Sequence, residues 1–380
     1  MSTENQSTAT CSTAIPGPRE GTDFSITPAR SSGEAVGVTV IIPTYQAEAT
    51  LSRALQSALG QTTGEIEVII ADDGSTDSSW RLIADWLLRE PRLRALRNVR
   101  NRGKSAVMNC ATSFARGRWL AVLDADDWYH PDRLATLTTL GEASKAEMVA
   151  DNQLFYDSGA ATVVGPAWPI GDGDWELTFD DYLLGSDVYE TFNLGMLKPL
   201  LRTEFVRSTR LSYDEGARFG QDFFYLLELF RRGGRAAVCD TPFYFYTQPF
   251  GAISRQWANA ARRRYDFQMA CDVNQRYLRD NAGILTPHLS HYLMARSRRL
   301  ESLERYFRAK ELFDRREWRG LLGRLVRHPT TLECAVRRLV GRYVGQSGAP
   351  TTARVARKSR QRSRLGPNLD GNSIPRFSAS

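Results

Sequence analysis

Short apolar runs alternate with polar loops and amphipathic stretches between residues 38 and 140. The apolar runs are rich in aliphatic and β-branched residues and predict strands at 38–43, 66–70, 93–96 and 119–123. Apolar residues at helical spacing predict helices from about Ala49, over 78–88 and over 106–116. Because strand, loop and helix recur in this order, the chain is expected to form an α/β fold with a mostly parallel central sheet flanked by helices.

Each predicted strand runs directly into a polar cluster. The clusters lie around Tyr45, Asp72, Asn101 and Asp124. Ligands of parallel sheets bind at the carboxyl ends of the strands. All four clusters are therefore expected on one edge of the sheet, as parts of a single binding site.

The most acidic cluster contains Asp124, Asp126 and Asp127, at the end of the apolar run 119–123. Carboxylates this close to a buried strand are costly to desolvate unless a cation neutralises them, which favours a divalent metal ion. The alternative is an acidic turn in which Asp127 caps the helix that Pro131 opens. Taken alone, this cluster leaves both interpretations open.

Four segments together resemble the nucleotide-sugar half of family 2 glycosyltransferases. They are Pro43–Glu48 (PTYQAE), Asp72–Asp77 (DDGSTD), Asn101–Asn109 (NRGKSAVMN) and Leu123–Trp128 (LDADDW). Their order and spacing match as well, and a looser resemblance, to bacterial polysaccharide-biosynthesis members, continues to about residue 255. The resemblance implies a GT-A fold, the α/β fold of nucleotide-diphospho-sugar transferases.

The resemblance also implies which residues hold the nucleotide sugar. The implied set is Pro43, Thr44, Tyr45, Glu48, Asp72, Asp73, Asn101, Gly103, Lys104, Asp124, Ala125 and Arg255. Asp72 would accept a hydrogen bond from the base and Tyr45 would offer an aromatic face, which suits uracil. Lys104 would lie near the diphosphate. The structural alternatives are packing for Tyr45 and a solvated loop position for Lys104.

In the same family pattern, Asp126 is the direct ligand of a divalent cation, Mn²⁺ or Mg²⁺, that bridges the two phosphates. Asp124 faces the ribose or the same metal ion. The family also has a catalytic base before a helix in its second half, and Asp222 matches that position here. The neighbouring residue, commonly glutamate in the family, is Gln221 in this chain. The alternative for Asp222 is the cap of the helix that follows.

These roles imply an inverting, metal-dependent transfer of a sugar, with a UDP-sugar as the favoured donor. The acceptor would be a hydroxyl of a glycan or a lipid-linked molecule in cell-surface polysaccharide biosynthesis. Trp168, Trp175 and Gln221 are candidate acceptor contacts, although tryptophans in such loops also serve as packing anchors. The rival functions are a non-catalytic sugar-nucleotide-binding scaffold and a nucleic-acid-binding protein.

Two nucleotide-binding motifs are excluded by spacing. Gly103-Lys104-Ser105 lacks the glycine that a P-loop needs five residues earlier, where this chain has Asn98. No G-x-G-x-x-G follows the first predicted strand, which argues against a dinucleotide site.

Composition divides the 380 residues into regions. We expect a disordered arm over 1–36 without a signal peptide, and a glycosyltransferase domain over 37–255, split into a nucleotide-sugar half (37–140) and an acceptor half (141–255). A basic helical extension over 256–346 and a disordered tail over 347–380 would follow. Five cysteines without paired or metal-type spacing suit a reducing cytoplasm. The sequence contains no run of about eighteen apolar residues that would span a membrane.

Positive charge is concentrated near the carboxyl terminus. Residues 291–380 contain 21 Lys and Arg against 7 Asp and Glu, a net charge of +14, whereas the whole chain carries +7. Apolar residues at helical spacing lie among the arginines over 318–326 and 332–343. Such helices suit an anionic membrane surface, which would place the protein at the inner face of the plasma membrane. They equally suit packing on the catalytic domain or on a second subunit. No recognisable nucleic-acid-binding module occurs among them, so nucleic acid is not an expected partner.

Overall fold

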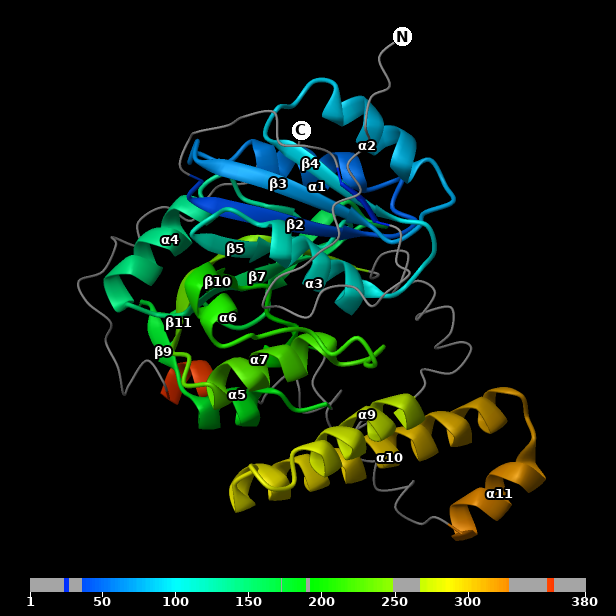
Figure 1. Cartoon of the computed structure of the whole chain (residues 1–380). Coiled ribbons are helices and arrows are strands. Elements are labelled where there is room, and N and C mark those ends of the chain that lie inside the picture. The colour runs from blue at the N-terminus through cyan, green and yellow to red at the C-terminus, as the bar shows by residue number, and fades with distance from the viewer. Residues whose placement is uncertain are drawn as a thin grey trace.

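The computed structural model describes residues 24–26, 36–171, 173–188, 192–248, 267–327 and 354–358 (Figure 1). In the first part of the chain the elements are β1 (Phe24–Ile26), β2 (Val38–Thr44), α1 (Leu51–Leu59), β3 (Ile66–Asp72), α2 (Ser79–Leu87), β4 (Leu93–Asn98), α3 (Lys104–Phe114), β5 (Trp119–Val122), β6 (Trp128–Tyr129) and α4 (Arg133–Ser144). Next come β7 (Met148–Asp157), β8 (Thr162–Pro166), β9 (Trp175–Leu177), α5 (Phe179–Gly185), the 3₁₀ helix η1 (Leu194–Met196), β10 (Leu200–Arg202), α6 (Thr203–Ser208), α7 (Gln221–Arg231) and β11 (Ala236–Gln248). The extension contains α9 (Phe267–Asp280), α10 (Pro287–Asp314) and α11 (Trp318–Arg327). Arg255 and the apolar pattern over 332–343 lie outside the described residues.

The predicted strands and helices of residues 38–122 form as expected, and the α/β class is confirmed. The sheet has the order β1-β4-β3-β2-β5-β10-β7-β11-β6. Strands β4, β3, β2 and β5 are mutually parallel. Beyond β5 the sheet is mixed, since β10 runs antiparallel to both β5 and β7. The prediction of a mostly parallel sheet therefore describes the nucleotide-sugar half better than the acceptor half.

Helices cover both faces of the sheet because its central strands are apolar on both sides. Val40 and Ile42 of β2 point into a core that includes the buried residues of α1 and α4, while Ile41 points into a second core with α3 and α7. At the outer edge, β1 pairs with β4, so part of the arm that composition predicts to be disordered is a strand.

A buried ion pair joins the two halves of the domain. Arg133 of α4 is fully buried and its guanidinium makes a two-pronged contact with Asp151 of β7, with Nη2–Oδ1 at 2.7 Å and Nε–Oδ2 at 3.1 Å. Arg133 Nη2 also donates to the backbone oxygen of Lys198 at 2.5 Å. The pair therefore fixes the start of the segment that leads into β10.

We expect Asp151→Asn to lower the free energy of unfolding by about 3–5 kcal/mol, because it leaves the Arg133 charge buried without its counter-ion. Urea unfolding of the purified protein measures the loss. Asp314→Asn, which removes an exposed helical pair with Lys310, is the matched control and should cost only about 0.3–0.5 kcal/mol. Equal losses in the two variants would contradict a structural role for the buried pair.

Trp168 and Trp175 are both core residues in the structure. Their exposed fractions are 1% and 0%, and both belong to the core that contains α5 and α7. Of the two roles considered for them, packing is the one that fits this burial. An acceptor sugar has no ring face to stack on at either residue.

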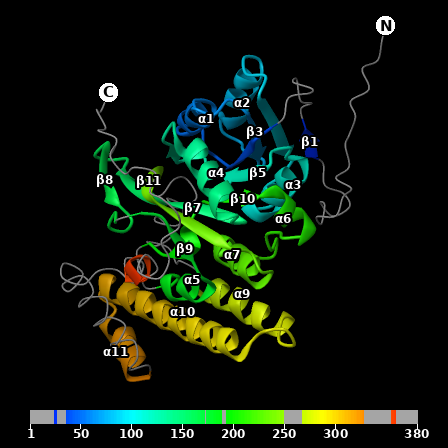
Figure 2. The ribbon, with the colours of Figure 1, turned by 90° about the vertical axis from the view of Figure 1, so that its left-hand side faces the viewer.

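The helices α9 and α10 pack beneath the acceptor half, against α5 and α7 (Figure 2). Arg296 donates to the backbone oxygen of Ser186 at 3.0 Å, and Arg299 Nη1 lies 2.9 Å from Asp187 Oδ2. Of the alternatives for the extension, packing on the domain that contains the sheet therefore applies to α9 and α10. α11 folds back from the end of α10 and lies on the side of α10 that is far from the sheet (Figure 1).

Candidate active site

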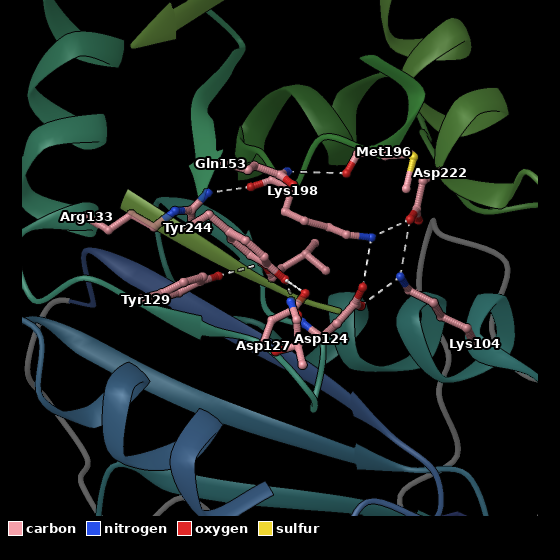
Figure 3. Close-up of polar contacts among 12 residues, drawn as sticks. Lys104, Asp124, Asp127, Tyr129, Arg133, Gln153, Met196, Lys198, Asp222 and Tyr244 are labelled. Carbon is pink, nitrogen blue, oxygen red and sulfur yellow. Dashed lines mark hydrogen bonds and ion pairs between the residues drawn. The ribbon is translucent and has the colours of Figure 1, made fainter. Parts of the chain in front are cut away.

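Two carboxylates and two ammonium groups meet at the carboxyl edge of the sheet (Figure 3). Lys198 Nζ lies 2.9 Å from Asp124 Oδ2 and 2.7 Å from Asp222 Oδ2. Lys104 Nζ lies 2.9 Å from Asp124 Oδ1 and 3.3 Å from Asp222 Oδ2. We call these four residues the Asp–Lys cluster. Each lysine bridges the two carboxylates, so the cluster joins the nucleotide-sugar half to the acceptor half.

Four different elements supply the cluster. Asp124 follows β5, where the strand ends at the sheet edge, and Lys104 is the first residue of α3. Lys198 precedes β10, which is paired on both sides, with β5 and with β7. Asp222 lies in the first turn of α7. The close approach of Lys198 to Asp124 thus follows from the antiparallel insertion of β10 beside β5.

Charge pairing outweighs burial at Asp124 and Lys198. Burial by itself would raise the pKa of the Asp124 carboxyl, but Lys104 and Lys198 hold that pKa well below its ordinary value. Burial would lower the pKa of the Lys198 ammonium, but Asp124 and Asp222 raise it well above 10.5. Asp124 and Lys198 are therefore both ionised at neutral pH, and each is the counter-ion of the other.

The two carboxylate oxygens of Asp222 differ in their hydrogen bonds. Its Oδ2 accepts from both lysines, whereas its Oδ1 is buried and has no hydrogen-bond partner within the described part of the chain. Burial alone would raise the pKa of Asp222, yet Lys104 and Lys198 keep it below 3.8. The N-cap position of α7 belongs to Gly220, and Asp222 makes no capping hydrogen bond, so the helix-cap alternative is wrong.

Asp127 has a structural role in this structure. Its carboxylate accepts from Tyr244 Oη at 2.7 Å and from the backbone N–H of Thr247 at 2.8 Å. Its pKa is raised well above the ordinary value, first by burial and then by the neighbouring Asp126 and Asp124. Asp127 therefore ties the acidic loop to β11. It does not cap α4, whose N-cap residue is Asp132.

Asp126 and Asp124 are the candidate ligands for a divalent cation. Asp126 is partly exposed, and its backbone oxygen is held by Arg53 Nη2 at 3.0 Å and by Thr247 Oγ1 at 2.5 Å. No group of three or more acidic, histidine or cysteine ligands occurs among the residues that the structure describes. Mg²⁺ characteristically binds through one or two carboxylates and completes its shell with substrate phosphates and water. Two carboxylates at this edge therefore fit a metal ion that binds together with a diphosphate.

Asp72 and Tyr45 lie at the ends of two adjacent strands, β3 and β2. Asp72 is buried, accepts from the backbone N–H of Ser75, and lies 3.5 Å from Arg97 Nε. Burial raises the pKa of Asp72, and the hydrogen bonds of Ser75 and the charge of Arg97 oppose this only partly. Tyr45 is partly exposed. This arrangement leaves a carboxylate and an aromatic side chain at the edge where the sequence predicts the nucleoside.

Asp73 shapes the loop before α3. Its carboxylate accepts from the backbone N–H groups of Arg102 at 2.8 Å and Gly103 at 2.6 Å, and from Asn98 Nδ2 at 2.8 Å. Gly103 has φ +94°, and a Cβ at this position would lie 2.3 Å from the guanidinium of Arg218. Glycine is therefore required there. Asp73 and Gly103 set the position from which Lys104 enters the Asp–Lys cluster.

The remaining residues that the sequence predicts for the site lie outside the Asp–Lys cluster. Pro43 and Gln221 are partly exposed, Glu48 and Asn101 are exposed, and Thr44 and Ala125 are buried at the same edge. Asn101 accepts from Arg218 Nη1 at 3.4 Å. Sequence reasoning missed Lys198 and Arg218. Lys198 lies in a segment noted for its resemblance to the acceptor side, but a lysine before a proline has no motif of its own.

The chain is similar in sequence to known glycosyltransferases. Residues 39–178 match the family described as glycosyl transferase family 2. The succinoglycan biosynthesis protein ExoO of Rhizobium meliloti is 31% identical over 230 residues, covering 57% of this chain and 62% of ExoO. WfaP of Escherichia coli, a UDP-Glc:α-D-GlcNAc-diphosphoundecaprenol β-1,3-glucosyltransferase, is 34% identical over 108 residues, covering 28% of this chain and 42% of WfaP. The matched region thus spans about three fifths of ExoO.

Two solved structures have a similar fold. S. aureus TarS 1–349 in complex with UDP-GlcNAc has a TM-score of 0.51 at 17% identity, covering 73% of this chain and 72% of TarS 1–349. The mannosyltransferase PcManGT of Pyrobaculum calidifontis, in complex with GDP-Man and Mn²⁺, has a TM-score of 0.50 at 16% identity, covering 90% of each chain. These likenesses confirm the predicted GT-A fold.

Proposed function

We propose that this chain, whose residues 39–178 form a family 2 glycosyltransferase domain, transfers a sugar from a UDP-sugar to an acceptor hydroxyl with inversion. The observation that carries the proposal is the pairing of Asp124 and Asp222 across the two halves of the domain. Asp124 lies at the carboxyl edge of the sheet, where the resemblance predicts the donor, and Asp222 has a buried oxygen that no group in the described part of the chain contacts by a hydrogen bond.

In the proposed mechanism Asp222 is the general base. Its Oδ1 removes the proton of the acceptor hydroxyl as the acceptor oxygen attacks the anomeric carbon. The bond between that carbon and the phosphate oxygen breaks on the opposite face, and its electron pair stays with the leaving diphosphate. One displacement therefore inverts the configuration. A carboxylate with a lowered pKa is fully ionised at neutral pH, so the base is ready in every molecule.

Lys104 and the acidic loop bind the donor. Lys104 would turn toward the diphosphate, and Asp126 and Asp124 would hold Mn²⁺ or Mg²⁺. A bound divalent ion supplies charge stabilisation to the leaving nucleoside diphosphate. Asp72 and Tyr45 would position the base of the nucleotide, with the buried carboxylate of Asp72 accepting its N–H.

The relatives support a role in polysaccharide biosynthesis. ExoO is named for succinoglycan biosynthesis, and WfaP for a diphosphoundecaprenol-linked acceptor. For this chain we infer an acceptor that is a glycan or a lipid-linked saccharide. Release of UDP from a panel of UDP-sugars, measured with free and lipid-linked acceptors, tests this inference. Product with inverted configuration and a requirement for Mn²⁺ or Mg²⁺ is expected. A retained configuration would contradict the single displacement.

The extension supports a second proposal, that the protein works at the inner face of the plasma membrane. In α11, the exposed fractions of Trp318, Leu322 and Val326 are 52%, 62% and 82%, and arginines lie on the same helix. An apolar helix surface flanked by arginines suits anionic lipid. None of the helices described here has both the length and the apolar character needed to cross a bilayer.

In a flotation assay we expect the protein to rise with vesicles that contain anionic phospholipid. It should stay at the bottom of the gradient when the vesicles are neutral. Trp318→Ser together with Leu322→Ser should weaken this binding about tenfold, because two apolar side chains no longer enter the interface. Leu184→Ser, an exposed residue of α5, is the control. Unchanged flotation of the α11 variant would contradict the proposal. A dimer that loses its association in the same variant would instead assign α11 to a subunit contact.

A further inference from the structure

The two lysines of the Asp–Lys cluster differ in burial and in anchorage. Lys198 is 6% exposed, whereas Lys104 is 19% exposed. The backbone oxygen of Lys198 is held by the buried Arg133, and β10 begins two residues later. Lys104 instead begins α3 directly after a loop whose residues 101–103 are exposed or partly exposed. Lys198 is therefore built into the core, and Lys104 is at the surface of the site.

The charges of the cluster must be redistributed when a donor binds. Asp124 and Asp222 are balanced by Lys104 and Lys198 in the structure. The diphosphate of a donor brings new negative charge, and the more exposed Lys104 is the cation that can turn to meet it. Asp222 would then keep one cationic partner, Lys198, at 2.7 Å. A carboxylate buried without any such partner would be driven toward its neutral form, which cannot accept a proton.

We propose that Lys198 is a positioning residue for the transfer reaction. Lys198 stays paired with Oδ2 of Asp222 throughout the reaction cycle, whereas Lys104 leaves Asp222 and pairs with the donor diphosphate. Lys198 thereby keeps Asp222 ionised and fixes its rotamer, so that Oδ1 is the oxygen that takes the acceptor proton. This inference rests on the proposed function, since it gives Lys198 its role through the proposed base.

The surroundings of Asp222 determine how pH should report this role. The charged and titratable groups that face it are Lys104 from α3, Lys198 before β10, Asp124 after β5, Tyr213 before α7 and Tyr182 from α5. Both tyrosines have a pKa raised well above 10 by burial, so they remain neutral. Among the residues that the structure describes, Lys104 and Lys198 are the cations that favour the ionised form of Asp222. Removing Lys198 should therefore raise the pKa of Asp222.

The test compares Lys198→Met, Lys104→Met and the exposed control Lys310→Met in the full chain. For Lys198→Met we expect kcat to fall about 10²-fold and the acid limb of the pH profile to move to higher pH, with the donor Kd, from calorimetry with UDP and Mn²⁺, changed less than about threefold. For Lys104→Met we expect the UDP Kd to rise about tenfold. Lys310→Met should match the wild type.

Several outcomes would overturn the inference. A wild-type kcat and an unmoved acid limb in Lys198→Met would do so, as would a loss confined to UDP binding. If Lys198→Met does not fold, Lys198→Arg replaces it: the retained charge should leave the acid limb where it is, and a displaced limb would overturn the inference. Asp222→Asn distinguishes a failure of the role of Lys198 from a failure of the proposed base. If Asp222→Asn is inactive while Lys198→Met is not, only the role of Lys198 fails; if Asp222→Asn keeps full turnover, the proposed base fails.

Discussion

Asp222→Asn is expected to lower kcat by about 10³–10⁴-fold while leaving donor binding almost unchanged. An amide cannot accept the acceptor proton, and general-base catalysis contributes up to about 10⁴-fold. Asparagine keeps the size of the side chain and an oxygen that can face Lys198, so the fold and the nucleotide-sugar half should persist. Steady-state turnover of the UDP-sugar, together with calorimetric binding of UDP, measures the two effects separately.

The control for this prediction is Asp214→Asn. Asp214 is also an acidic residue of the acceptor half, but it is 47% exposed and pairs with Arg276 away from the cluster. It should keep wild-type kcat. Turnover that survives Asp222→Asn with less than about tenfold loss would contradict the base assignment. Absent turnover in the wild type, with normal donor binding, would favour a non-catalytic sugar-nucleotide-binding scaffold.

The second large effect is expected for Asp126→Asn. Loss of a carboxylate ligand should weaken binding of the metal ion. The charge stabilisation of the leaving diphosphate, which is worth several kcal/mol, should weaken with it. We therefore expect kcat/KM to fall about 10²–10³-fold, and the concentration of Mn²⁺ that gives half-maximal activity to rise. A titration of activity against Mn²⁺ in wild type and variant measures both changes.

Asp132→Asn is the matched control because Asp132 is a nearby aspartate, after β6, that is 54% exposed beside His130. Its Mn²⁺ dependence should equal that of the wild type. Activity in Asp126→Asn that keeps the wild-type Mn²⁺ dependence would remove this residue from the metal site. Activity of the wild-type protein that survives a strong chelator would remove the metal from the mechanism.

The nucleotide-sugar half was predictable because its strands and its site residues lie next to each other in the sequence. The apolar runs of β2, β3, β4 and β5 read as strands in the sequence, and each is followed at once by the polar residues that it presents. In a parallel sheet the end of a strand is also the location of its loop, so Asp72, Lys104 and Asp124 could be assigned to one edge. The structure brings two of these three, Lys104 and Asp124, into direct contact.

The acceptor half was less predictable because its site depends on pairing between distant segments. Lys198 meets Asp124 only because β10 inserts antiparallel between β5 and β7, and no local pattern encodes that register. Burial of Trp168 and Trp175 likewise depends on which elements cover their loop. The two interpretations of Asp127 could not be separated either, since its partner Tyr244 lies far along the chain.

We propose above all that the carboxyl edge of this sheet binds a nucleotide diphosphate sugar together with a divalent cation. Thermal unfolding with a panel of UDP- and GDP-sugars, each with and without Mn²⁺ or Mg²⁺, tests it most directly. A donor present at about 100 times its Kd should raise Tm by about 5–10 °C, and only when the cation is present. We predict this rise for at least one UDP-sugar, and its loss in Asp126→Asn. No rise with any UDP- or GDP-sugar and either cation would contradict the proposed donor site.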